Sequence, residues 1–155
     1  MKNGIIGVCL IGSGRAGMIH AENFKSRVPH AKMVAVVDPN REAAESACKE
    51  LDIRKSYGDY IQALNDSEVD AIIIATPTAL HCKIAVAAAK AGKHILCEKP
   101  MAMDENECDE MIKSAKENRV NLQIGFMRRF DESFIQAKKQ IENGEIGDIV
   151  LVKSN

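Results

Sequence analysis

Apolar and polar residues follow one another along this chain in a regular order. Six short apolar runs are separated by longer segments in which apolar residues recur every three or four positions. Several runs are apolar almost throughout instead of alternating, which is typical of strands covered on both faces. The predicted strands are residues 5–11, 32–37, 54–57, 71–75, 94–97 and 121–125.

The segments between these strands carry the signals of amphipathic helices. Asn40 is a plausible N-cap, Gly92 stands at a helix end, and Asp104 with Glu107 forms a capping-box pattern. The last of these helices should turn Cys108, Met111, Ile112 and Ala115 inward. The predicted helices cover about residues 18–24, 40–51, 60–64, 79–91, 104–115 and 130–142.

Six strands alternating with helices predict an α/β fold. Such an order implies parallel strands joined by right-handed crossovers, hence a doubly wound sheet of the Rossmann type with strand order 3-2-1-4-5-6. Ligands of this fold bind across the carboxyl ends of the strands.

The C-terminal segment does not fit this domain. Residues 148–153, DIVLVK, are predicted as a seventh strand, although a six-stranded domain is already complete. We therefore expect a dinucleotide-binding domain over residues 1–125, a helical connection over 126–147, and the start of a truncated second domain over 148–155. Because an unpaired apolar strand is an association site, a homo-oligomer formed through it is expected.

The first apolar run ends in a glycine motif, GSGRAG, whose parts have separate mechanical roles. Gly12 allows a tight turn, Gly14 lets a pyrophosphate approach the backbone, and Gly17 lets the following helix pack closely. The helix N-terminus then offers unpaired N–H groups to the phosphates. The predicted cofactor-binding residues of this loop are Gly12, Ser13, Gly14, Arg15, Ala16 and Gly17.

The second strand ends in Asp38, about 20 residues beyond the motif, where a dinucleotide fold places its ribose-binding acid. A carboxylate there can accept both ribose hydroxyls of NAD but repels the 2′-phosphate of NADP. We therefore expect NAD as the cofactor, with NADP disfavoured. Arg41 is the reservation, because a nearby arginine can offset that repulsion, and it is included among the predicted cofactor contacts.

Composition excludes several other functions. The formal net charge is -1 and no basic block is present, so nucleic acid is not an expected partner. No apolar run is long enough to span a membrane, and no signal peptide precedes the first strand. The five cysteines lack CxxC spacing, which favours a reducing cytoplasm, free thiols and no metal site.

Three polar clusters fall at the carboxyl ends of later predicted strands. They read ATPTALH after the fourth strand, CEKP after the fifth and GFMRRFD after the sixth. Together with GSGRAG, Asp38 and GEIGDI near the end, they resemble the sugar and polyol dehydrogenases of the glucose–fructose oxidoreductase / inositol dehydrogenase / MocA family. The resemblance covers the whole chain, and GFMRRFD looks most like inositol dehydrogenases.

This resemblance implies hydride transfer between NAD and a secondary alcohol of a sugar or inositol-like polyol. Lys99 matches the family's catalytic lysine and Glu98 the acid beside it, and both are included among the predicted cofactor contacts. A cationic nicotinamide about 4 Å from the ammonium would repel it by about 4 kcal/mol at an effective dielectric near 20, which favours the neutral amine.

Further cofactor contacts follow from the same resemblance. Ala75, Thr76 and Pro77 belong to the cluster expected to line the cofactor cleft, and Arg128 is expected to reach the nicotinamide side. His81 either contacts the site or lies on its helix surface, and both possibilities stay open. His20 and His94 are expected to be structural.

Members of this family are about twice as long, and their second half supplies the substrate pocket. We therefore expect the chain to bind NAD and to show little turnover alone. The alternatives are a stand-alone nucleotide-binding module, redox-sensing or completed by a partner chain, and a domain that binds coenzyme A. Glu98-Lys99-Pro100 and Asp38 argue against coenzyme A.

Overall fold

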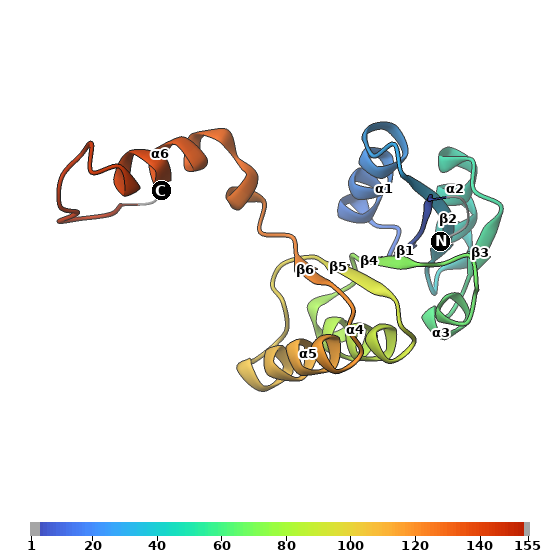
Figure 1. The fold of residues 1–155 in the computed structure, drawn as a ribbon. Coiled ribbons are helices and arrows are strands. Elements are labelled where there is room, and N and C mark those ends of the chain that lie inside the picture. Colours follow the sequence, from blue (N-terminus) through green and yellow to red (C-terminus); the bar gives the residue numbers. More distant parts are fainter. Residues whose placement is uncertain (1–3, 154–155) are drawn as a thin grey trace. The chain divides into compact units, whose positions relative to one another are not determined.

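The computed structural model describes residues 4–153 of the chain. Its centre is a six-stranded, all-parallel sheet with the order β3-β2-β1-β4-β5-β6, which confirms the predicted Rossmann topology (Figure 1). The strands are β1 (Ile6–Ile11), β2 (Ala31–Val37), β3 (Lys55–Tyr57), β4 (Ala71–Ile74), β5 (His94–Cys97) and β6 (Leu122–Ile124).

The central strands are apolar on both sides because helices cover both faces of the sheet. In β1, Cys9 and Ile11 join the core cluster that includes residues of α3, α4 and α5. Val8 and Leu10 point to the opposite face and pack with residues of α1 and α2. This explains why the run lacks the alternation of a half-exposed strand.

The helices lie in two layers around the sheet (Figure 1). Helices α1 and α2 cover one face, and α3, α4 and α5 cover the other. A 3₁₀ helix, η1 (Thr78–Leu80), leads directly into α4. The helices are α1 (Arg15–Arg27), α2 (Arg41–Leu51), α3 (Tyr60–Leu64), α4 (His81–Lys90) and α5 (Glu105–Glu117).

The residues predicted to begin or end helices have these roles in the structure. The side chain of Asn40 accepts a hydrogen bond from the Ala43 N–H, and Gly92 adopts a positive φ just after α4. Asp104 caps α5 by accepting from the Glu107 N–H at 2.9 Å. The Glu107 carboxylate reaches back one residue further than a capping box does, to the N–H of Met103.

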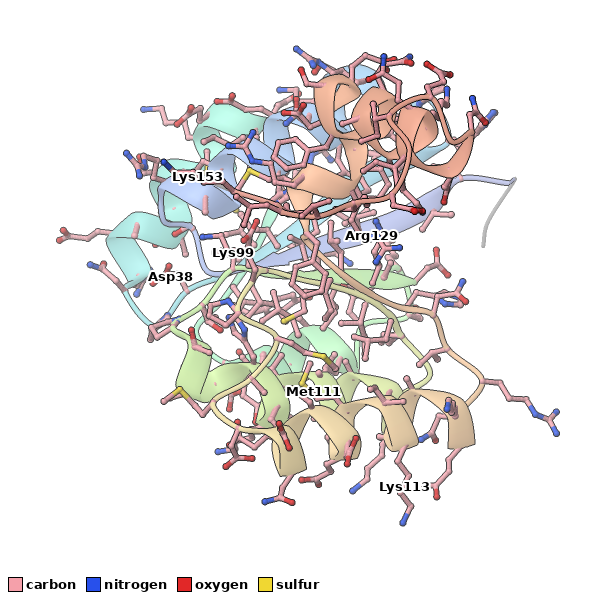
Figure 2. All side chains as sticks on the ribbon, turned by 90° about the vertical axis from the view of Figure 1, so that its left-hand side faces the viewer. Asp38, Lys99, Met111, Lys113, Arg129 and Lys153 are labelled. Carbon is pink, nitrogen blue, oxygen red and sulfur yellow. The ribbon has the colours of Figure 1, made fainter. Side chains whose placement is uncertain are left out.

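One face of α5 departs from the prediction. Met111 and Ala115 are buried as expected, and Figure 2 shows Met111 on the inner side of the helix and Lys113 projecting outward. Ile112 is 39% exposed, so its predicted inward position is wrong. The small side chain of Ser114 is buried instead. The stripe that meets α4 is therefore narrower than the apolar pattern suggests.

The structure divides into two compact units, with the break between Gly125 and Phe126. The second unit holds a 3₁₀ helix, η2 (Met127–Phe130), and α6 (Glu132–Glu142). Residues 148–153 are irregular, so the predicted seventh strand is absent from the described residues. A strand needs a neighbour to accept its hydrogen bonds, and these residues have none within the sheet described. Within residues 4–153, no helix has the length and apolarity needed to cross a membrane.

Candidate functional site

The loop between β1 and α1 is shaped by two glycines in close contact. Gly12 has a φ of +96°, and a Cβ there would lie 2.6 Å from the backbone oxygen of Ala75. A Cβ on Gly17 would lie 2.0 Å from the backbone oxygen of Gly12. Only glycine fits either position, so the helix begins directly against the loop and the end of β4.

Gly14 differs from these two because nothing lies within 4 Å of the position of its Cβ. It is the N-cap residue of α1 and provides no side-chain cap. The first N–H groups of α1, at Arg15, Ala16 and Gly17, lack intrahelical acceptors by their position. Open space and unpaired donors therefore meet at the helix N-terminus, which suits an anionic group.

Asp38 is held against the tip of this loop. Its Oδ2 accepts from the backbone N–H of Ser13 at 3.0 Å and from the Ser13 hydroxyl at 2.8 Å. Its Oδ1 accepts from the N–H of Asn40 at 2.9 Å. Partial burial alone would raise the pKa of Asp38, but the hydrogen bonds from Ser13 and Asn40 outweigh it and lower the pKa. The carboxylate is therefore both oriented and kept ionised.

Arg41 is not paired with Asp38. It begins α2, its side chain is exposed, and its Nε donates to Oε1 of Glu45 at 2.7 Å, one helical turn away. This pair raises the pKa of Arg41. Arg41 therefore does not neutralise the charge of Asp38, which faces the glycine loop. A contact between Arg41 and the cofactor stays a prediction.

The end of β4 contributes backbone and one buried hydroxyl. Ala75 packs against Gly12, and the exposed Pro77 directly precedes η1. The Oγ1 of Thr76 is buried and has no hydrogen-bond partner among the described residues. Buried hydroxyls are normally satisfied, so this atom is a candidate contact for a bound group.

His81 is buried, so its expected position on the helix surface is wrong, and its contact with a cofactor stays a prediction. Its Nδ1 lies 2.9 Å from the backbone oxygen of Pro100, and its Nε2 lies 2.9 Å from that of Thr76. It is only 1% exposed. His81 thus links the backbone after β4, at Thr76, to the backbone after β5, at Pro100.

The end of β5 carries Glu98 and Lys99. Oε1 of Glu98 lies 2.6 Å from Nε2 of His20, and Oε2 accepts from the backbone N–H of Lys99 at 3.0 Å. The side chain of Lys99 is exposed, and the Lys99–Pro100 peptide bond is cis. Figure 2 labels Lys99 and Asp38, which follow the carboxyl ends of β5 and β2 in the same sheet.

His20 is the site residue that sequence reasoning missed. It stands one helical turn after Gly17, and such pairs share a face of a helix. Because Gly17 packs against the loop, that face had to point toward the strand ends. The spacing between Gly17 and His20 could have placed His20 near the strand ends. It could not identify Glu98 as the partner, which is 78 residues away in sequence.

Cys9 and Cys97 in the first unit carry free thiols, which react as nucleophiles only when ionised. Burial raises the pKa of the Cys9 and Cys97 thiols to about 12, so neither forms a thiolate near neutral pH.

Arg128 belongs to the second unit, where its guanidinium contacts Asp131 at 3.0 Å and the ring of Phe134. Its predicted contact with a nicotinamide stays a prediction.

The carboxyl ends of β1, β2, β4 and β5 therefore form one polar edge of the sheet. The residues it brings together fit a dinucleotide: an open helix N-terminus at Gly14, an oriented carboxylate at Asp38 and an unpartnered hydroxyl at Thr76. Within the described residues, no group of three His, Cys, Asp or Glu side chains is arranged to hold a metal ion.

Comparison with known proteins gives concordant matches. The profile of the GFO_IDH_MocA family, described as "Oxidoreductase family, NAD-binding Rossmann fold", matches residues 6–126. The scyllo-inositol 2-dehydrogenase (NAD(+)) of Bacillus subtilis is 42% identical over 144 residues, covering 93% of this chain. The myo-inositol 2-dehydrogenase of Thermotoga maritima is 39% identical over 138 residues, covering 89% of this chain.

A solved structure agrees with these relatives. The crystal structure of scyllo-inositol dehydrogenase from Lactobacillus casei with bound NAD(H) and scyllo-inositol superposes with a TM-score of 0.89 at 33% identity. The match covers 94% of this chain and 43% of that one. The chain spans only 42% and 41% of the two curated relatives, so less than half of each is represented here.

Proposed function

The chain belongs to the Gfo/Idh/MocA oxidoreductase family, whose NAD-binding Rossmann fold it shares, and we propose that it is the cofactor-binding half of a dehydrogenase. The dehydrogenase would transfer a hydride between NAD and a secondary alcohol of an inositol-like polyol. The observation that carries this proposal is the Asp38 carboxylate, held by Ser13 at the tip of the glycine loop.

Each part of the dinucleotide has a matching group in the first unit. The open N-terminus of α1 at Gly14 would hold the pyrophosphate, and Asp38 would accept the hydroxyls of the adenosine ribose. The buried Thr76 hydroxyl offers a further polar contact near the end of β4. The carboxylate would oppose the 2′-phosphate of NADP, which supports NAD as the cofactor.

Oxidation of an alcohol removes a hydride from carbon and a proton from the hydroxyl. NAD⁺, when bound, supplies the hydride acceptor. Lys99 is the proposed base, because a neutral amine at its Nζ can accept the hydroxyl proton. The Glu98 carboxylate accepts a hydrogen bond from the backbone N–H of Lys99 and so helps to hold the backbone there.

The remaining length of the relatives supports a further part of the proposal. We propose that the part of the relatives that this chain does not cover forms the substrate pocket, so that this chain alone shows little or no turnover. Residues 126–147 would connect the halves, and residues 148–155 would begin the second domain. Val150, Leu151 and Val152 are 95%, 83% and 75% exposed, and burying them requires more polypeptide or a second copy.

Two alanine substitutions test the cofactor site. Gly14→Ala should keep the melting temperature within a few degrees, because the structure has open space there. It should weaken NADH binding by at least about 10-fold, since the methyl group would occupy the pyrophosphate position. Fluorescence titration with NADH and calorimetric melting measure both quantities.

Gly17→Ala is the matched comparison in the same loop. Its Cβ would collide with the backbone oxygen of Gly12, so it should cost about 1–3 kcal/mol of stability or more. If Gly14→Ala binds NADH as well as the unchanged chain, no pyrophosphate lies over Gly14 and the proposed site is wrong.

A further inference from the structure

The contact between His20 and Glu98 joins two segments at the rim of the site. His20 is in the second turn of α1, and Glu98 directly follows β5. Because an ionised carboxylate only accepts hydrogen bonds, the Nε2–H of His20 is the donor in the 2.6 Å contact with Oε1. The short distance is typical of a charge-assisted hydrogen bond.

The second carboxylate oxygen of Glu98 connects the contact with His20 to the backbone of Lys99. Oε2 of Glu98 accepts from the backbone N–H of Lys99 at 3.0 Å. On the far side of the following residue, the backbone oxygen of Pro100 is held by the buried ring of His81. The backbone that carries the Lys99 amine is therefore fixed on both sides, by one histidine directly and by the other through Glu98.

Gly125 leaves room for the Glu98 carboxylate because it has no side chain. A Cβ on Gly125 would be 3.3 Å from Oε1 and 3.5 Å from the carboxyl carbon of Glu98. The start of α1, the end of β5 and the end of β6 thus converge on one carboxylate. Among residues 4–153, removing the His20 donor leaves the carboxylate with the hydrogen bond from the Lys99 N–H alone.

We propose that His20 is a positioning residue for Lys99, acting through Glu98. The side chains of His20 and Glu98 are 25% and 21% exposed, and partly exposed ion pairs contribute little to stability. What the contact fixes, through Glu98, is the backbone from which the Lys99 amine extends. This inference rests on the proposed role of Lys99 as the base, where small displacements of a catalytic group cost about 10²-fold in rate.

The first test is made on this chain without cofactor. In His20→Ala, the amide hydrogen of Lys99 should exchange about 10-fold faster, as measured by NMR, while the melting temperature stays nearly unchanged. His20→Gln should restore slow exchange, because its side-chain amide places a donor where Nε2 stood. His30 is an exposed histidine in the turn before β2, so His30→Ala is the matched control and should change nothing.

The second test uses the complete dehydrogenase. His20→Ala should lower kcat by about 10- to 100-fold with KM for NAD within about 3-fold, and His20→Gln should recover most of it. Gly125→Ala, which crowds the same carboxylate from the other side, should also lower kcat. Unchanged Lys99 exchange in His20→Ala, or faster exchange with unchanged kcat, overturns the proposal. NADH binding by the unchanged chain is measured in parallel, so a failure of the cofactor site is recognised separately.

Discussion

Replacing Lys99 with methionine should lower kcat of the complete dehydrogenase by about 10²- to 10⁴-fold, the usual contribution of a general base. Methionine keeps the length of the side chain and removes the proton acceptor. KM for NAD should change little, since the pyrophosphate and ribose contacts lie on the glycine loop and at Asp38. Steady-state formation of NADH with myo-inositol or scyllo-inositol as substrate measures both constants.

Lys99→Arg is the informative control for this prediction. Arginine keeps the positive charge but stays protonated at neutral pH, so it cannot serve as a base. Both variants should be equally impaired if the proton transfer is the role of Lys99. A Lys99→Arg enzyme with nearly full kcat would show that only the charge at this position matters, and Lys99 would not be the base.

Replacing Asp38 with alanine should weaken NADH binding by about 10- to 100-fold in this chain. Hydrogen bonds to a charged group contribute about 1.5–3 kcal/mol, which corresponds to that range of affinity. NADPH binding should weaken less or improve, because the charge that repels its 2′-phosphate is gone. Asp38→Arg should carry the change further and favour NADPH.

The control for Asp38 is Asp109, an exposed residue of α5. Asp109→Ala changes the net charge equally and should leave both affinities unchanged. Parallel fluorescence titrations with NADH and NADPH give the ratio of dissociation constants for each variant. Equal losses of NADH and NADPH affinity in Asp38→Ala would mean that Asp38 supports the loop without reading the ribose.

Much of the fold could be predicted because its signals are local. The strands are continuous apolar runs, and α2 and α5 begin directly after Asn40 and Asp104, whose side chains cap them as the sequence indicates. The glycine motif and Asp38 lie in one strand–helix–strand unit, so their meeting is dictated by the fold type. The sheet order then followed from the rule of right-handed crossovers.

The parts that were missed depend on contacts between distant segments. The pairing of His20 with Glu98 and the bridge made by His81 require knowing which strand ends are adjacent in space. The exposure of Ile112 depends on how far α5 overlaps α4, which apolar periodicity alone does not specify. The apolar run at residues 148–153 has strand propensity, but without a neighbouring strand in the described sheet it stays irregular.

The central claim is that the first unit carries a dinucleotide site, and titration of this chain with NADH tests it most directly. The chain contains no tryptophan, so the fluorescence of NADH can be followed with little interference from the protein. The account predicts saturable binding of NADH, weaker binding of NADPH and no competition by coenzyme A. Absence of saturable NADH binding by the folded chain, or its displacement by coenzyme A, would contradict it.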